Sequence, residues 1–74
     1  MSQVVIYTMP NCVQCNATKK YCDDKNIEYT TVDISTDPSA YNLVSSLGYK
    51  QAPVVIAGDS HWAGFRPDML VTLH

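Results

Sequence analysis

The chain has 74 residues, enough for one domain with a small core, and we expect residues 1–74 to fold as a single unit. Hydrophobic residues make up 46% and charged residues 16%, and three cysteines are too few for a disulfide-stapled scaffold. The net charge of -2, without a basic block, gives no indication of a nucleic-acid partner. Met1–Gln3 lacks the basic run of a signal peptide and the next apolar run is too short for a membrane span, so we expect a cytoplasmic protein without a membrane partner.

The first predicted strand is Gln3–Thr8, which is rich in β-branched residues and ends at the turn Met9–Asn11. A helix is expected to follow from Cys12 to about Lys25, with Asn11 as its N-cap. Its apolar face is expected to carry residues spaced by four positions, together with a neighbouring cysteine: Val13, Ala17, Tyr21 and Cys22.

Cys12 and Cys15 form a CxxC motif between this strand and this helix. At a helix N-terminus, unpaired backbone amides and the macrodipole stabilise a thiolate, which lowers the pKa of the first cysteine. The second cysteine lies one turn further on, within reach of a disulfide. The motif therefore predicts thiol-disulfide exchange, with Cys12 as the nucleophile and Cys15 as the residue that resolves the mixed disulfide.

A metal-binding module is the alternative, because CxxC also supplies half of many zinc sites. Cys12 and Cys15 would then need Cys22 or a histidine, or two chains would share an iron-sulfur cluster. Cys22 lies two helical turns from the motif, about 10 Å along the axis, and no second CxxC is present. We therefore expect no bound metal and a core position for Cys22.

The rest of the chain predicts three more strands and two more helices. Asp37 and Pro38 suit a helix start, Gly48 suits its end, and the apolar face would be Ala40, Tyr41, Leu43, Val44 and Leu47. The strands are expected at Ile27–Ile34, Val54–Ala57 and Ser60–Gly64, and the last helix at Pro67–Leu73. The resulting order is β-α-β-α-β-β-α, an α/β chain with a central four-stranded mixed sheet and three helices, which is a minimal thioredoxin fold like that of glutaredoxins.

Three segments carry a family resemblance that spans essentially the whole chain. They are Cys12–Cys15 followed by Ala17-Thr18-Lys19, the segment Gln51–Val55, and the stretch Trp62–Asp68. With these motifs the chain resembles the NrdH-type redoxins, which are glutaredoxin-like proteins of the thioredoxin superfamily. The resemblance implies a dithiol electron donor that reduces the catalytic subunit of class Ib ribonucleotide reductase. It also implies recharging by thioredoxin reductase with electrons from NADPH, and no bound cofactor. We expect a monomer, although the sequence itself does not determine the oligomeric state.

A glutathione-dependent glutaredoxin with general protein disulfide reductase activity is the second enzymatic reading. Glutathione needs cations for its two carboxylates and an acidic or backbone cradle for its amine. Glutaredoxins commonly place a lysine shortly before CxxC, where this chain has Met9, and an acidic residue in the region where it has Arg66. Both departures favour a protein reductant over glutathione.

The resemblance also implies a cis Ala52–Pro53 peptide bond that faces CxxC and offers the Ala52 backbone to an extended partner strand. The aromatic residues that are candidates for an exposed rim around the cysteines are Tyr7, Tyr49, Trp62 and Phe65, although a mainly structural role is favoured for Trp62. Four residues near the site are expected to be structural: Thr8, Trp62, Arg66 and Asp68. Arg66 and Asp68 would pair with each other or fix the hairpin to the second helix.

Overall fold

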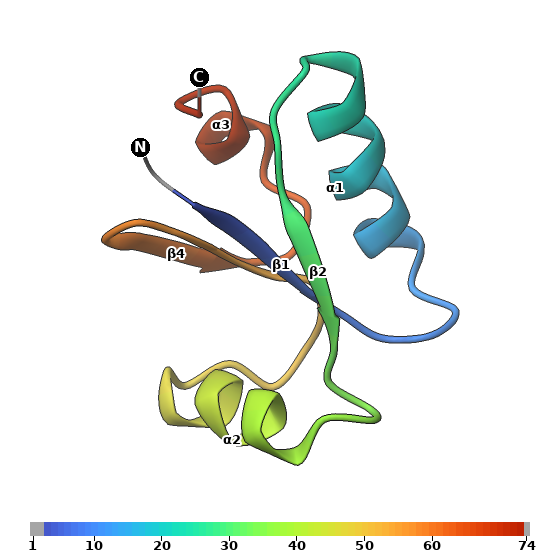
Figure 1. Cartoon of the computed structure of the whole chain (residues 1–74), viewed down its shortest axis with the longest axis vertical. Helices are drawn as coiled ribbons and strands as arrows, with labels where there is room; N and C mark the ends of the chain where they lie inside the picture. The colour runs from blue at the N-terminus through green and yellow to red at the C-terminus, as the bar shows by residue number, and fades with distance from the viewer. Residues whose placement is uncertain (1–2, 74) are drawn as a thin grey trace.

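The computed structural model describes residues 3–73, and its element order agrees with the sequence prediction (Figure 1). The helices are α1 (Val13–Asp24), α2 (Pro38–Ser46) and α3 (Pro67–Leu70). The strands are β1 (Val4–Thr8), β2 (Thr30–Asp33), β3 (Val54–Ala57) and β4 (Ser60–Ala63). Among these residues, no helix combines the length and apolarity needed to cross a membrane.

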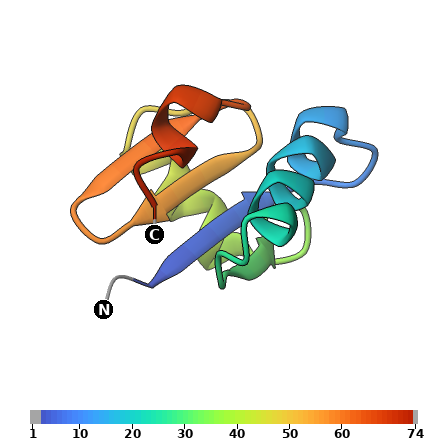
Figure 2. The ribbon, with the colours of Figure 1, turned by 90° about the horizontal axis from the view of Figure 1, so that it is seen from above.

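The four strands form one mixed sheet in the order β2-β1-β3-β4. β1 pairs with β2 in parallel and with β3 antiparallel, and β3 and β4 form an antiparallel hairpin. In Figure 1, α1 and α3 lie above the sheet and α2 lies below it, and Figure 2 looks onto the face that α1 and α3 cover. The fold is the predicted thioredoxin-like one.

The two sheet faces carry separate parts of the core because side chains alternate along each strand. Toward α1 and α3, Ile6 of β1 lies opposite Val55 of β3, which pairs with Trp62 of β4. Toward α2, Tyr7 lies opposite Val54. The site residues Tyr7 and Trp62 are thus part of the core on opposite faces of the sheet.

The buried face of α1 differs from the predicted one. Val13 is 81% exposed, whereas Cys15, Thr18 and Cys22 are buried. Burial of Thr18 is possible because its hydroxyl donates a hydrogen bond to the Gln14 carbonyl at 2.9 Å, so the polar group keeps a partner. Cys22 is buried as predicted and Tyr21 packs against the same core cluster, so the prediction fails at Val13 and omits Cys15 and Thr18.

Two further boundaries and one face depart from expectation. Asn26 has φ 57°, and the Ile27 amide bonds back to the Cys22 carbonyl, so this segment closes α1 and β2 starts only at Thr30. α3 ends at Leu70 rather than at Leu73, and a turn follows it. In α2, Ala40 and Val44 are buried as predicted, but Tyr41 is 57% and Leu43 41% exposed.

Candidate active site

Cys12 itself caps α1, and this corrects the prediction that Asn11 would do so. Cys12 has an extended backbone with φ -106° and ψ 106°, and its Sγ accepts a hydrogen bond from the Cys15 amide at 3.0 Å. Asn11 instead takes a left-handed conformation with φ 59°, in the turn before the helix. The cysteine sulfur therefore occupies the position where a helix N-terminus stabilises negative charge best.

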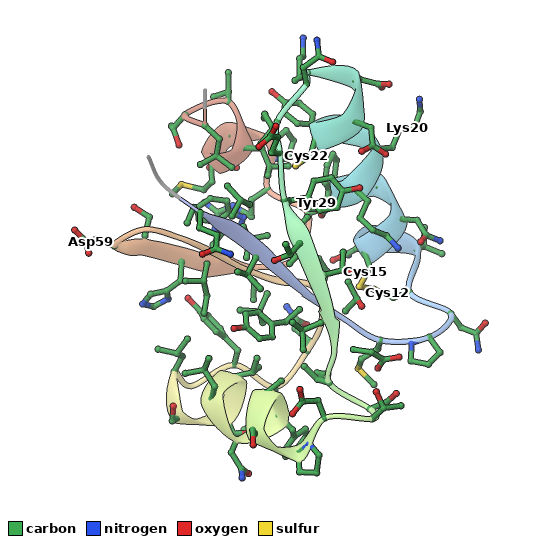
Figure 3. The ribbon with its side chains drawn as sticks, in the orientation of Figure 1. Cys12, Cys15, Lys20, Cys22, Tyr29 and Asp59 are labelled. Carbon is green, nitrogen blue, oxygen red and sulfur yellow. A yellow bond between two sulfur atoms is a disulfide. The ribbon has the colours of Figure 1, made fainter. Side chains whose placement is uncertain are left out.

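Cys12 and Cys15 are joined by a disulfide, with their Cα atoms 5.2 Å apart, at the first turn of α1 (Figure 3). Cys12 is half-buried, while Cys15 is only 1% exposed. A thiol that approaches from outside therefore reaches Cys12, and Cys15 is shielded. This asymmetry agrees with the nucleophile and resolving roles predicted for the two residues.

Cys22 stands apart from this redox pair. It is a free cysteine, fully buried on α1 among core residues such as Ile6 and Leu70. Burial raises the pKa of its thiol, and the negative charge of Asp23 raises it further. The expected core position is confirmed. Within residues 3–73, no group of three or more His, Cys, Asp or Glu is arranged to hold a metal ion.

The Ala52–Pro53 peptide bond is cis, as the resemblance implied. Pro53 is buried, Ala52 is half-buried, and β3 begins at the next residue, Val54. The Pro53 carbonyl accepts a hydrogen bond from the Gly64 amide at 2.7 Å, which ties this segment to the end of the β3–β4 hairpin. A role for Ala52 and Pro53 in partner binding stays a prediction.

The aromatic candidates separate into core and surface residues. Tyr7 was expected at an exposed rim, but it is only 9% exposed and packs toward α2 with Ile34 and Val44, so that expectation is wrong. Strand alternation directs its ring into the core. Trp62 is 3% exposed and structural, as expected, whereas Phe65 is 36% exposed and remains a surface candidate.

The remaining predicted neighbours have structural contacts. Thr8 donates its hydroxyl to the Val32 carbonyl at 3.5 Å and so links β1 to β2. Arg66 and Asp68 pair with each other through two hydrogen bonds of 3.1 and 2.8 Å at the start of α3. The Arg66 guanidinium lowers the pKa of the Asp68 carboxyl, and Asp68 raises that of Arg66.

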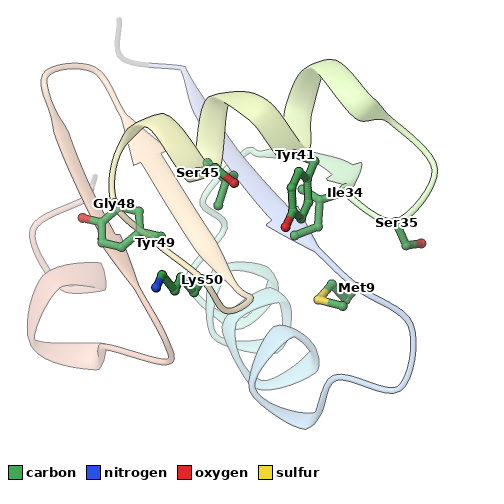
Figure 4. Close-up of a pocket in the computed structure, with 9 residues that line it drawn as sticks. Met9, Ile34, Ser35, Tyr41, Ser45, Gly48, Tyr49 and Lys50 are labelled. Carbon is green, nitrogen blue, oxygen red and sulfur yellow. The ribbon is translucent and has the colours of Figure 1, made fainter.

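A cavity of about 510 Å³ lies beside α2, and its wall includes Met9, Tyr41, Tyr49 and Lys50 (Figure 4). Met9 follows β1 directly and precedes the CxxC motif, while Lys50 precedes the cis-proline segment. The wall of the cavity therefore includes residues that lie three positions before Cys12 and three positions before Pro53 in the chain. Tyr49 is fixed by a hydrogen bond of 2.7 Å between its hydroxyl and Nδ1 of His61.

Gln14 is the site residue that sequence reasoning missed. Its Oε1 accepts a hydrogen bond from the Phe65 amide at 3.4 Å, so a residue inside the CxxC motif contacts a segment 51 positions later. Gly64, the residue before Phe65, has φ 84°, and a Cβ on it would lie 3.5 Å from Gln14 Oε1. Nothing local in the sequence indicates such a contact, because it depends on how α1 and the hairpin end meet.

A sheet of this topology, with a CxxC disulfide at the start of α1 and a cis-proline before β3, defines a thiol-disulfide oxidoreductase of the thioredoxin fold. The glutaredoxin family model matches residues 4–62. The chain is 45% identical over 71 residues to the glutaredoxin-like protein NrdH of Salmonella typhimurium, covering 96% of this chain and 88% of that one. It belongs to the glutaredoxin family and, within it, to the NrdH-type redoxins.

More distant relatives and a solved structure agree. The glutaredoxin-like protein NrdH of Lactococcus lactis is 33% identical over 70 residues, covering 95% of this chain and 97% of that one. The solved NrdH-redoxin structure from Escherichia coli, described as having a thioredoxin-like activity profile, superposes with a TM-score of 0.94 at 42% identity. That match covers 97% of this chain and 95% of the other. The likeness therefore extends over the whole fold.

Proposed function

We propose that this thiol-disulfide oxidoreductase is the dithiol electron donor of a class Ib ribonucleotide reductase, and that thioredoxin reductase returns it to the dithiol form with electrons from NADPH. One observation carries the chemistry: Sγ of the half-buried Cys12 accepts the Cys15 amide at the N-terminus of α1, while Sγ of Cys15 is shielded. The similarity to NrdH proteins supports the choice of partners. A monomer in the reducing cytoplasm fits this role.

The reaction begins with the Cys12 thiolate, which attacks one sulfur of the partner disulfide. A mixed disulfide forms, the partner disulfide breaks, and the first partner thiolate leaves. Cys15 then loses its proton and attacks Sγ of Cys12, which breaks the mixed disulfide and releases the second partner thiolate. Two electrons have moved from the dithiol to the partner, and the Cys12–Cys15 disulfide remains.

The helix N-terminus assists the thiolate steps. The Cys15 amide already points at Sγ of Cys12 at 3.0 Å, so it can stabilise negative charge on this sulfur when Cys12 is a thiolate or a leaving group. The same donor assists Cys12 as the nucleophile toward the partner disulfide. It also assists Cys12 as the leaving group during recharging, when a second thiolate of the reductase attacks the reductase sulfur of its mixed disulfide with Cys12.

Glutathione-dependent recycling is the competing proposal, and two side chains speak against it. Met9 gives an apolar, 44% exposed surface where a cation would bind a glutathione carboxylate. Arg66 places a half-exposed guanidinium, paired with Asp68, in the segment where an acid would bind the glutathione amine. The thioredoxin-like activity profile of the Escherichia coli relative points the same way.

The test follows NADPH oxidation with a model disulfide in two parallel assays, one with thioredoxin reductase and one with glutathione plus glutathione reductase. Wild type, Cys12→Ser and the control Cys22→Ala are compared. We expect activity with thioredoxin reductase alone, lost in Cys12→Ser and retained in Cys22→Ala. A second assay supplies the reduced protein to a class Ib ribonucleotide reductase and measures deoxyribonucleotide formation. Turnover with glutathione alone would replace this proposal with the glutaredoxin reading.

A further inference from the structure

The side chain of Gln14 connects the redox centre to an exposed aromatic residue. Gln14 lies between the two cysteines, and its backbone carbonyl is fixed by the Thr18 hydroxyl at 2.9 Å. Its side-chain carbonyl accepts the Phe65 amide at 3.4 Å. The segment that carries Phe65 is therefore bonded directly to the first turn of α1.

This segment is attached at two other points as well. On its N-terminal side, the Gly64 amide donates to the Pro53 carbonyl at 2.7 Å. On its C-terminal side, the Arg66 carbonyl accepts the amides of Met69 and Leu70 as α3 begins. These three bonds hold the two ends of the turn, and the Gln14 contact is the one that orients the Phe65 backbone relative to CxxC.

The surroundings of Cys12 indicate what Phe65 could contact. Three exposed apolar side chains come from the segments next to the redox centre: Met9 at 44%, Val13 at 81% and Phe65 at 36% exposure. Apolar and aromatic side chains around a reactive group form the kind of surface that protein partners bury. A small disulfide, by contrast, needs to reach only the sulfur.

We propose that Gln14 is a positioning residue for partner recognition, which holds the Phe65 backbone so that the Phe65 ring contacts the protein that presents its disulfide to Cys12. This inference uses one part of the proposed function, namely that the partner disulfide belongs to a protein. Gln14 acts through Phe65 and takes no part in the exchange of electrons, so its loss should weaken protein binding and leave the reaction at the sulfur unchanged.

The experiment measures the reduction of insulin disulfides with dithiothreitol as the source of electrons. In a separate single-turnover measurement, the pre-reduced protein, freed of dithiothreitol, reduces a small aromatic disulfide, 5,5′-dithiobis(2-nitrobenzoic acid). Gln14→Leu should raise KM for insulin roughly five-fold, which corresponds to about 1 kcal/mol, the usual net worth of one hydrogen bond. Its kcat for insulin and its rate with the small disulfide should equal those of wild type. Asn42→Leu, on the exposed side of α2, is the matched control.

Two further variants separate positioning from a general structural effect. Gln14→Glu keeps an oxygen acceptor for the Phe65 amide, so it should restore KM, while its negative charge near Cys12 should shift the pH profile of kcat to higher pH. Phe65→Ala should raise KM as Gln14→Leu does, and the double variant should be no worse than Phe65→Ala, because both changes remove the same contact.

The opposite results would overturn the inference. An unchanged KM for insulin in Gln14→Leu, additive effects in the double variant, or an equal loss with the small disulfide would each show that Gln14 does not act through Phe65. Failure of the proposed function would appear elsewhere, as inactivity of the wild-type protein with thioredoxin reductase. The insulin and small-disulfide assays do not contain that enzyme, so the two failures are distinguishable.

Discussion

The amide of Cys15 donates a hydrogen bond to Sγ of Cys12 at 3.0 Å, within the same turn that the disulfide closes. One cysteine thus supplies both the resolving sulfur and a backbone donor to its partner. The backbone donor is independent of the Cys15 side chain, so substitution of that side chain should leave the activation of Cys12 largely in place.

Cys15→Ser should therefore still attack a partner disulfide but should stop at the mixed disulfide. We expect a covalent adduct with the partner that is stable without reductant and disappears with dithiothreitol, visible by non-reducing electrophoresis and mass spectrometry. Cys12→Ser should form no adduct, because the two remaining cysteines, Cys15 and Cys22, are only 1% and 0% exposed. An adduct that forms through Cys15 instead would reverse the assigned roles.

The burial of Cys22 predicts selective alkylation of the reduced protein. Iodoacetamide at pH 8 should modify Cys12 and leave Cys22 intact, since Cys22 is fully buried and burial raises the pKa of its thiol. Denaturant should make Cys22 reactive. Peptide mapping by mass spectrometry gives the order of modification, and early labelling of Cys22 would contradict the packed position.

The same raised pKa of Cys22 predicts a loss of stability in alkaline solution. Above its ordinary pKa of 9.0, this thiol ionises in the unfolded chain but not in the folded one, so the unfolded state binds fewer protons and the free energy of unfolding falls as pH rises. Cys22→Ala should be less stable than wild type by about 1 kcal/mol at pH 7, through the small cavity. The difference should shrink at higher pH, as measured by urea denaturation of the reduced proteins.

The Arg66–Asp68 pair predicts a small effect in acid. Since Arg66 lowers the pKa of the Asp68 carboxyl, the stabilisation is complete above the unfolded pKa of about 4 and is lost as pH falls through the lower folded value. Arg66→Gln should lower Tm slightly at pH 6 and not at all once Asp68 is protonated. Because both groups are exposed to solvent, salt should also remove the difference.

Gly64→Ala should affect both stability and partner binding. The residue has φ 84°, which costs an L side chain about 1–2 kcal/mol, and the added methyl would touch Gln14 Oε1. Gly48→Ala is a matched control, because Gly48 has φ 90° but nothing within 4 Å of an added Cβ. Both variants should lose stability in urea, and Gly64→Ala alone should also raise KM for insulin. Equal KM values for insulin in the two glycine variants would show that the turn at Gly64 takes no part in partner recognition.

Much of the fold is readable from local signals. Three local signals are the CxxC motif, the cap Asp37 with Pro38 as the first helical residue, and the short apolar run Val54–Ala57. The helix or strand that each one indicates forms where it was predicted. The ends of elements are less readable: the left-handed Asn26 shortens β2, and Cys12 replaces Asn11 as the cap of α1. In both cases an asparagine takes the left-handed turn conformation that its side chain tolerates.

The site was less predictable than the fold, because it depends on which elements meet. Tyr7 was a candidate for the exposed rim, but strand alternation and α2 bury it. The contact between Gln14 and Phe65 joins residues 51 positions apart, so no local pattern contains it. By contrast, Arg66 and Asp68 lie close in sequence, and their pairing was foreseeable.

The unequal exposure of the two cysteines limits how the protein can pass electrons from a donor to an acceptor. Because Cys12 is the accessible sulfur and Cys15 is shielded, any electron donor and any disulfide substrate must approach the same sulfur atom from the same face. They cannot occupy it together. The protein must release one before it binds the other, so donor and acceptor compete for it. A large excess of either should slow electron transfer between them.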